Sequence, residues 1–267
     1  MIAGAKKLAV LVAAGAALAL AGCGSGGEAG APAGAAPGAA APEARDLTVF
    51  AAASLTETFT DLGKQFEAVH PGVTVRFNFG ASSDLAQQIV NGAPADVFAS
   101  ASDATMKTVT DAGANAAEPT VFATNALRIA TAPGNPKGIA TFADLTRPDL
   151  KVVVCAPQVP CGATAEKIEK ATGVTLTPVS EEPDVKSALG KVTSGDADAG
   201  LVFVTDVTSA GDDVQGVPFP EAERAVTTYP ITVLADAPQP DLAAEFQQLV
   251  TGERGRMALE AVGFGTP

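Results

Sequence analysis

Apolar residues recur along the chain with two spacings, which divide its first half into alternating strands and helices. Residues 47–50 form a short run of strand-favouring residues. Apolar positions then follow at steps of three and four from Leu55 to Val69, the spacing of one buried helix face. The next expected elements are a strand over 73–79, a helix containing residues 85–90 and a strand over 96–100. This β-α-β-α-β order predicts a parallel sheet with helices on both faces.

The same alternation restarts near residue 125, which predicts a second α/β lobe. Strands are expected over 126–131, 151–155, 175–179, 199–204 and 228–234, and helices over 142–145, after Cys161, over 184–193, 241–251 and 253–262. We therefore predict an α/β, two-lobed protein with a ligand cleft between the lobes. Lobe 1 would comprise residues 46–127 with 230–267 and lobe 2 residues 128–229. In such sheets, ligands bind at the carboxyl ends of strands, where helices begin.

The N-terminal residues are typical of an export signal rather than of the fold. Lys6 and Lys7 precede an apolar stretch, residues 8–20, that is short for a membrane span. The stretch ends in Leu-Ala-Gly-Cys, which resembles a bacterial lipobox with Cys23 as the lipidated residue. We expect residues 1–22 to be a signal peptide and the Gly/Ala/Pro-rich residues 23–45 to be a flexible tether. The protein would then be lipid-anchored at the outer face of the cytoplasmic membrane.

Composition argues against several classes of function. The formal charge is −13 and no basic cluster stands out, so nucleic acid is not an expected partner. His70 is the single histidine and lies in a His-Pro-Gly turn, which disfavours a metal site and a Ser-His or Cys-His nucleophile. We therefore expect no enzyme activity and no cofactor. The pair Cys155 and Cys161 flanks a five-residue loop, and a disulfide is possible if the loop turns back on itself.

Several predicted helix starts carry groups that could bind a small anion. Ser54, the pair Ser82 and Ser83, the turn over 159–162 and Val185 all follow expected strands. A helix start offers free backbone N–H groups and the positive end of the helix dipole. Ser54 has a simpler interpretation too, because with Glu57 it forms a capping-box pattern that would only begin a helix.

Six segments together resemble the molybdate-binding proteins of bacterial ABC importers. They are residues 48–56 (TVFAAASLT), 81–89 (ASSDLAQQI), 91–98 (NGAPADVF), 159–162 (VPCG), 184–189 (DVKSAL) and 200–206 (GLVFVTD). The resemblance implies a type II periplasmic-binding-protein fold that closes over one tetrahedral oxyanion, molybdate or tungstate. It also implies a monomer that delivers the anion to a membrane permease powered by an ATPase, with no direct metal-ion ligands from the protein.

The resemblance also implies roles for individual residues. Ser54 and Ser82 would bind the anion through their hydroxyl groups. Ser83 would take the place of Ser82 if the match to the family were shifted by one residue. Cys161 and Val185 would donate backbone N–H groups, and a Cys155–Cys161 bridge would stiffen the first of these loops.

One position departs from the family pattern. Phe203 stands where some members have a tyrosine that donates its hydroxyl. Either a water or Tyr229 replaces that donor, or the site makes one bond fewer; packing or hinge support is the simpler role for Tyr229.

Other functions remain open at this point. A binder of sulfate or another small oxyanion would use the same donors, and only cavity size would reject sulfate. A hydrolase with Ser54 as nucleophile lacks a base to activate it, and a structural surface lipoprotein would not need serines at helix starts. Asp84 and Asp184 lie beside the expected donors, where we expect them to stabilise helix N-termini.

Overall fold

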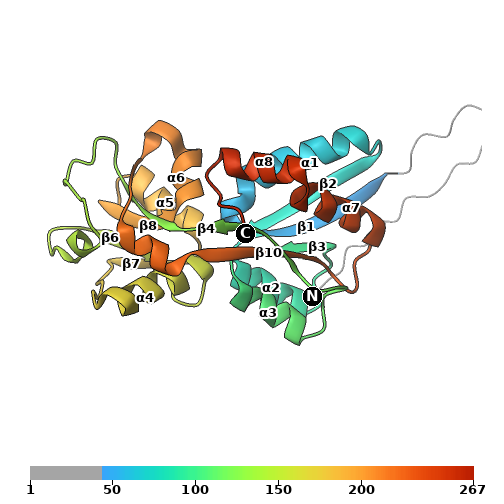
Figure 1. Ribbon diagram of the computed structural model, residues 1–267, viewed down its shortest axis with the longest axis horizontal. Coiled ribbons are helices and arrows are strands. Elements are labelled where there is room, and N and C mark those ends of the chain that lie inside the picture. The colour runs from blue at the N-terminus through green and yellow to red at the C-terminus, as the bar shows by residue number, and fades with distance from the viewer. Residues whose placement is uncertain (1–43) are drawn as a thin grey trace, which may run out of the picture. The chain divides into compact units, whose positions relative to one another are not determined.

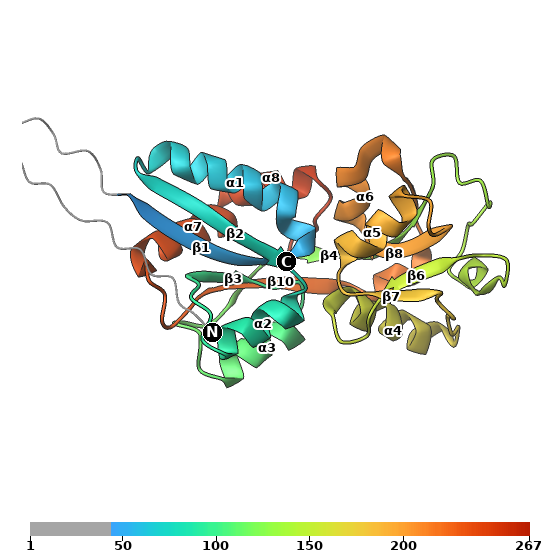
Figure 2. The ribbon, with the colours of Figure 1, turned by 180° about the vertical axis from the view of Figure 1, so that it is seen from behind.

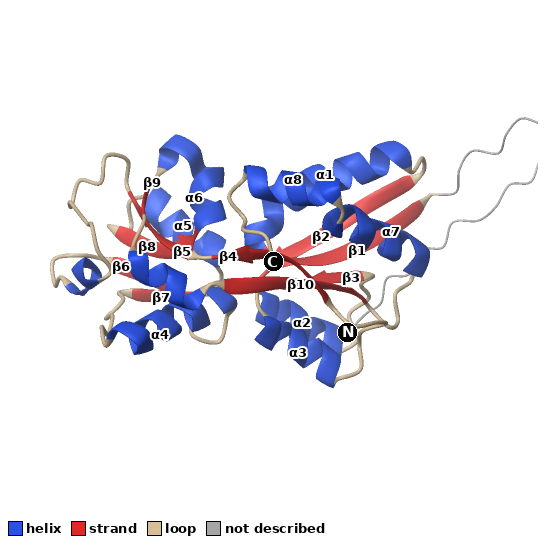
Figure 3. Ribbon diagram, viewed as in Figure 1, coloured by secondary structure: helices blue, strands red, loops and turns tan. Residues whose placement is uncertain are grey.

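Two mixed β-sheets, each flanked by helices, make up the computed structural model, which describes residues 44–267 (Figure 1, Figure 3). The expected signal peptide, the lipidation site Cys23 and nearly all of the expected tether lie outside the described residues. Across residues 44–267, no helix is both long and apolar enough to cross a membrane.

The strands are β1 (Arg45–Ala52), β2 (Val73–Gly80), β3 (Val97–Ala99), β4 (Thr120–Asn125), β5 (Leu127–Thr131), β6 (Val152–Cys155), β7 (Ser180–Glu182), β8 (Ala199–Phe203), β9 (Gln215–Val217) and β10 (Thr227–Val233). The α-helices are α1 (Thr56–Val69), α2 (Ser82–Val90), α3 (Asp103–Asp111), α4 (Pro160–Thr172), α5 (Val185–Thr193), α6 (Val204–Ala210), α7 (Pro240–Thr251) and α8 (Glu253–Ala261). Short 3₁₀ turns are η1 (Ala53–Leu55), η2 (Ala143–Thr146), η3 (Gly211–Asp213) and η4 (Pro220–Ala225).

The first sheet has the strand order β2-β1-β3-β10-β4 and is covered on both faces. Helices α1, α7 and α8 lie on one face, while α2 and α3 lie on the other (Figure 1, Figure 2). Separate apolar clusters form beneath these two layers, with Phe59 and Phe246 in one and Leu85 and Phe98 in the other. Strands β1, β2 and β3 are parallel, as predicted, but β10 runs antiparallel to both of its neighbours.

The second sheet has the order β7-β6-β8-β5-β9, with β6 parallel to β7 and β8. β5 is antiparallel to β8 and β9, so this sheet is mixed as well. Its helices and turns enclose one large apolar cluster, which also takes in Ala53 and Ala81 from the first lobe.

The chain passes twice between the sheets, both times at the same end of the antiparallel pair β4 and β10, where Asn125 pairs with Thr227. β4 ends at Asn125 and β5 begins at Leu127 in the other sheet. The return is at Val226, since β10 begins at Thr227 in the first sheet, three residues before the expected boundary at 230. Within β10 the register shifts between Tyr229 and Pro230, which accommodates a proline in a central strand.

Several predicted elements differ from those in the structure. The strand expected over 175–179 is wrong, because the pairing with β6 begins at Ser180. Pro178 has no N–H for a ladder, and Leu176 is buried as part of a loop rather than of a strand. Helices α3 and α6 and strands β4 and β9 were not predicted.

Candidate functional site

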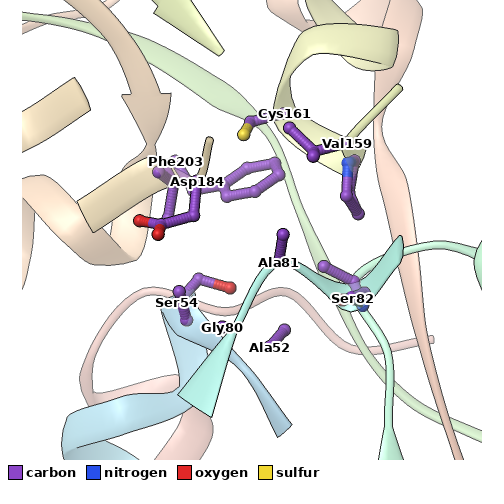
Figure 4. Close-up of a pocket in the computed structure, with 13 residues that line it drawn as sticks. Ala52, Ser54, Gly80, Ala81, Ser82, Val159, Cys161, Asp184 and Phe203 are labelled. Atoms are coloured by element: carbon purple, nitrogen blue, oxygen red, sulfur yellow. Dashed lines mark hydrogen bonds between the residues drawn. The ribbon is translucent and has the colours of Figure 1, made fainter. Parts of the chain in front are cut away.

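A small pocket lies where helix starts from both lobes meet (Figure 4). It encloses about 230 Å³ of space, part of it open to solvent. Its lining residues are Ala52, Ala53, Ser54, Gly80, Ala81, Ser82, Ala101, Val159, Pro160, Cys161, Asp184, Val185 and Phe203. The structure therefore brings together Ser54, Ser82, Cys161, Val185 and Phe203, five of the residues singled out from the sequence.

The first-lobe wall is built from the ends of β1 and β2 and from the turns that follow them. Ser54 lies in η1 directly after β1, and Ser82 is the first residue of α2 after β2. The neighbouring positions are small, such as Ala52 and Gly80, so the backbone and the two hydroxyl groups form the surface. First-turn N–H groups of a helix lack intrahelical acceptors and are available to an anion.

The Ser82 hydroxyl is held by the backbone of the next loop. Its Oγ accepts a hydrogen bond from the Ala101 N–H at 3.0 Å, and the side chain is buried. A hydroxyl has one proton to donate, and this one remains free for a ligand in the pocket. Ser83 lies elsewhere, in a hollow with Asp84 and Gln158, so the structure places Ser82 and not Ser83 at the pocket.

The Ser54 hydroxyl contacts Tyr229 and does not cap α1. The Oγ of Ser54 and the Oη of Tyr229 are 2.8 Å apart. The N-cap of α1 is Leu55 and has no side-chain cap, so the capping-box interpretation of Ser54 with Glu57 is wrong. Ser54 lies inside the 3₁₀ turn η1, one residue before the N-cap of α1, and the contact of its hydroxyl is with Tyr229 instead. Tyr229 itself does not line the pocket.

The second-lobe wall is formed by the starts of α4 and α5. Cys161 lies in the first turn of α4 and is joined to Cys155, at the end of β6, by a disulfide. Helix and loop approach closely here, because a Cβ at Gly162 would lie 2.0 Å from the carbonyl oxygen of Ala156. The disulfide and the close approach at Gly162 together fix the backbone that presents the Cys161 N–H.

Val185 is the first residue of α5, and the residue before it caps the helix. Asp184 Oδ1 accepts the Ser187 N–H at 2.8 Å, as expected for an N-cap aspartate. Asp184 is also among the residues that line the pocket, at the N-terminus of α5, where the helix dipole favours negative charge. Asp84 lies in the first turn of α2, away from this pocket.

Phe203 closes the pocket from the end of β8. Its side chain is 1% exposed, and its ring packs edge-on against Tyr229 with centroids 6.1 Å apart. Phenylalanine has no polar group to donate, and Tyr229 does not reach the pocket to replace a donor directly.

No lysine or arginine is among the residues that line the pocket. Lys186 of α5 contacts Glu57 of α1 at 2.8 and 2.9 Å and lies 3.3 Å from Asp206 of α6. Asp206 is fully buried and accepts the Phe203 N–H at 3.1 Å. Burial raises the pKa of Asp206 to about 6, although the charge of Lys186 acts in the opposite direction. In residues 44–267, no group of three or more His, Cys, Asp or Glu side chains is placed to hold a metal ion.

Several polar residues that contact Tyr229 and Phe203 carry no signal in the local sequence. Asn125 donates to Thr205 Oγ1 at 2.9 Å and lies 3.4 Å from the Tyr229 hydroxyl. These contacts join segments about 80 to 100 residues apart, and no local spacing signals them. Lys186 and Asp206 lie within the segments quoted above, but only the fold brings them together.

Figure 4 shows Ser54 and Ser82 on one side of the pocket and Cys161, Val159 and Phe203 on the other. Two α/β lobes that share two chain crossings and present hydrogen-bond donors around one small pocket define the class of two-lobed solute-binding proteins.

Comparisons with known proteins identify the family. Residues 47–265 match the family of bacterial extracellular solute-binding proteins. The molybdate-binding protein ModA of Mycobacterium tuberculosis H37Rv is 52% identical over 245 residues, 92% of each chain. The chain therefore belongs to the bacterial extracellular solute-binding proteins and, within them, to the family of ModA.

Solved structures support the fold. The substrate binding domain of a putative molybdenum ABC transporter from Clostridium difficile has a TM-score of 0.61 at 27% identity, covering 83% of this chain and 99% of that one. The periplasmic molybdate-binding protein of Azotobacter vinelandii has a TM-score of 0.71 at 22% identity and the same coverage, a likeness that shows the fold alone. The predicted α/β, two-lobed binding-protein fold is thus confirmed.

Proposed function

We propose that this protein captures molybdate outside the cytoplasm and delivers it to the permease of an ABC importer. The observation that carries the proposal is one pocket in which Ser54 and Ser82 of one lobe face the helix starts at Cys161 and Val185 of the other. The relatives named above bind molybdate or serve a molybdenum transporter, which supports the same ligand.

The chemistry of the donors suits a fully deprotonated oxyanion. Hydroxyl and backbone N–H groups can each donate to an oxygen of a dianion, and none of them carries a full charge. A site without lysine or arginine can release what it captures, as transport requires. Hydrogen phosphate needs an acceptor for its proton, and the one carboxylate in the pocket wall, Asp184, serves as the N-cap of α5 through its Oδ1.

Finer features of the function are part of this proposal. Tungstate has the charge and shape of molybdate and would occupy the same donors. The chain would act as a monomer without a cofactor and without catalysis, with a lipid on Cys23 holding it at the outer face of the membrane. The lipobox-like Leu-Ala-Gly-Cys sequence supports that anchor.

Removal of either serine hydroxyl tests the site. Ser54→Ala and Ser82→Ala each remove a donor to a charged ligand, and we expect molybdate to bind at least about tenfold more weakly. Ser83→Ala is the matched control, because Ser83 neighbours Ser82 in α2 but lies outside the pocket. Isothermal titration calorimetry with sodium molybdate measures all three. Unchanged affinity in both Ser54→Ala and Ser82→Ala, or a loss only in Ser83→Ala, would contradict the assignment.

A further inference from the structure

Behind Ser54, a chain of buried hydrogen bonds fixes the direction in which its hydroxyl donates. We propose that Tyr229 and Asn125 are positioning residues for oxyanion binding, which act through Ser54 and do not touch the ligand. The inference rests on the proposed function, because it concerns how the same pocket presents its donors. It assigns a role to two buried polar side chains beside the crossing between the lobes.

The direction of the chain begins at Asn125. Its Oδ1 accepts the N–H of Ala126 at 3.0 Å, which leaves the amide NH₂ on the other side of the group. That NH₂ faces two hydroxyl oxygens, Thr205 Oγ1 at 2.9 Å and Tyr229 Oη at 3.4 Å. An amide nitrogen can only donate, so the Tyr229 oxygen is the acceptor in the longer and weaker contact.

The Tyr229 hydroxyl therefore has a single acceptor to which it can donate its proton. The side chain is fully buried, and burial raises the pKa of its hydroxyl, so it stays protonated at neutral pH. Within residues 44–267, its polar contacts are Asn125, which donates to it, and Ser54 Oγ at 2.8 Å. Tyr229 donates to Ser54, and the Ser54 oxygen is the acceptor.

With its oxygen engaged in this way, Ser54 has its own proton left for the pocket. The oxygen of Ser82 likewise already accepts a hydrogen bond, in this case from the N–H of Ala101. Both hydroxyl groups at the pocket are thus set as donors before the ligand arrives, which lowers the free-energy cost of ordering them on binding. In a chain of aligned hydrogen bonds each donor also polarises the next, so the Ser54 O–H becomes a stronger donor to the anion.

The chain spans both lobes. Ser54, Tyr229 and Asn125 belong to the first lobe, and Thr205 lies on α6 of the second. Asn125 is the last residue of β4, directly before the crossing. The direction of the Ser54 hydroxyl is therefore set at the crossing between the lobes.

A double-mutant cycle separates positioning from general support of the fold. Tyr229→Phe removes the proton donated to Ser54 and keeps the ring, and we expect molybdate to bind about threefold to tenfold more weakly. In a Ser54→Ala background the same change should produce no further loss, because the group through which Tyr229 acts is absent. Titration calorimetry with sodium molybdate, and in parallel with sodium sulfate, measures the four proteins.

Two further variants serve as control and second test. Phe122→Leu alters the packing against the same ring, since Phe122 meets Tyr229 edge-on at 6.2 Å, but it leaves the hydrogen bonds in place. We expect it to lower the melting temperature and leave the affinity unchanged. Asn125→Ala should give a smaller loss of affinity than Tyr229→Phe, again absent in the Ser54→Ala background, and it provides the cycle if Tyr229→Phe does not fold.

These measurements distinguish a failure of the positioning role from a failure of the proposed function. Equal losses of affinity in the two backgrounds, or no loss in either, would overturn the positioning role. If the unaltered protein binds sulfate and not molybdate, the proposed ligand is wrong, while the cycle measured with sulfate still decides the role of Tyr229. If the unaltered protein binds neither anion, both proposals fail.

Discussion

Two serine hydroxyls of the first lobe show how single residues become anion donors. Ser54 and Ser82 are both buried, and each oxygen already lies within hydrogen-bond distance of a donor from the protein. A serine on a surface can donate or accept as its ligand requires, whereas these two are set to donate. The residue type therefore matters less than the partner behind it, which is Tyr229 for one serine and the Ala101 backbone for the other.

The Phe203 position offers a test at the same scale. Phe203→Tyr adds a hydroxyl to a ring that lines the pocket and packs against Tyr229. We expect the affinity for molybdate to be unchanged or up to about tenfold higher, because the added group can donate one more charge-assisted hydrogen bond. Calorimetry measures the change. Clearly weaker binding would mean that the pocket is shaped around the phenylalanine.

At the scale of elements, the site depends on where helices begin. The disulfide and Gly162 hold the first turn of α4 against the end of β6, and Asp184 caps α5. Helix α6 begins directly after Phe203, and Asp206 in its first turn accepts the Phe203 N–H. Burial displaces the pKa of this last carboxylate towards neutral pH.

Asp206 predicts a pH dependence of stability. Its pKa is about 6 in the folded protein and 3.8 is its ordinary value, so the folded state holds a proton that the unfolded chain has lost between these pH values. The free energy of unfolding should therefore fall as the pH rises from about 4 to about 6, and this contribution should be constant above that window. Asp206→Asn keeps an acceptor for the Phe203 N–H and should remove this part of the slope. Urea unfolding of both proteins across the window measures it; identical slopes would contradict the account.

At the scale of the whole molecule, both lobes contribute residues to the one pocket in which the ligand would bind. The lobes share the crossings at Asn125 and Val226, and the pocket takes donors from both. An ion pair also joins the lobes directly, because Lys186 on α5 of the second lobe contacts Glu57 on α1 of the first. An anion that bridges donors from both lobes would favour arrangements in which the lobes approach each other over more open ones.

The Lys186 ion pair should contribute modestly to affinity. Lys186→Met removes the tie between the lobes, and we expect molybdate to bind about two- to fivefold more weakly at low ionic strength, which is the range for a partly exposed ion pair. The difference should shrink at high salt because of screening. Lys170→Met is the control, since Lys170 pairs with Glu166 within α4 alone. Equal effects of the two substitutions would argue against a role in closure.

The sequence predicted what depends on local spacing and missed what depends on distant contacts. The helix at residues 56–69 and the strand at 73–80 followed from apolar periodicity, since each buries one face. The strand expected at 175–179 was wrong because apolar residues there serve a loop. Ser54 could be placed at a strand end, but its bond to Tyr229 joins residues 175 positions apart, and no pattern in the sequence encodes that contact.

The anion preference of the pocket decides between molybdate capture and the binding of another small oxyanion. Molybdate, tungstate, sulfate and phosphate would each be titrated into the purified protein at neutral pH by calorimetry. The account predicts tight one-to-one binding of molybdate and tungstate, with no heat of binding from phosphate and far weaker binding of sulfate. Preferential binding of sulfate or phosphate, or binding of none of the four, would contradict it.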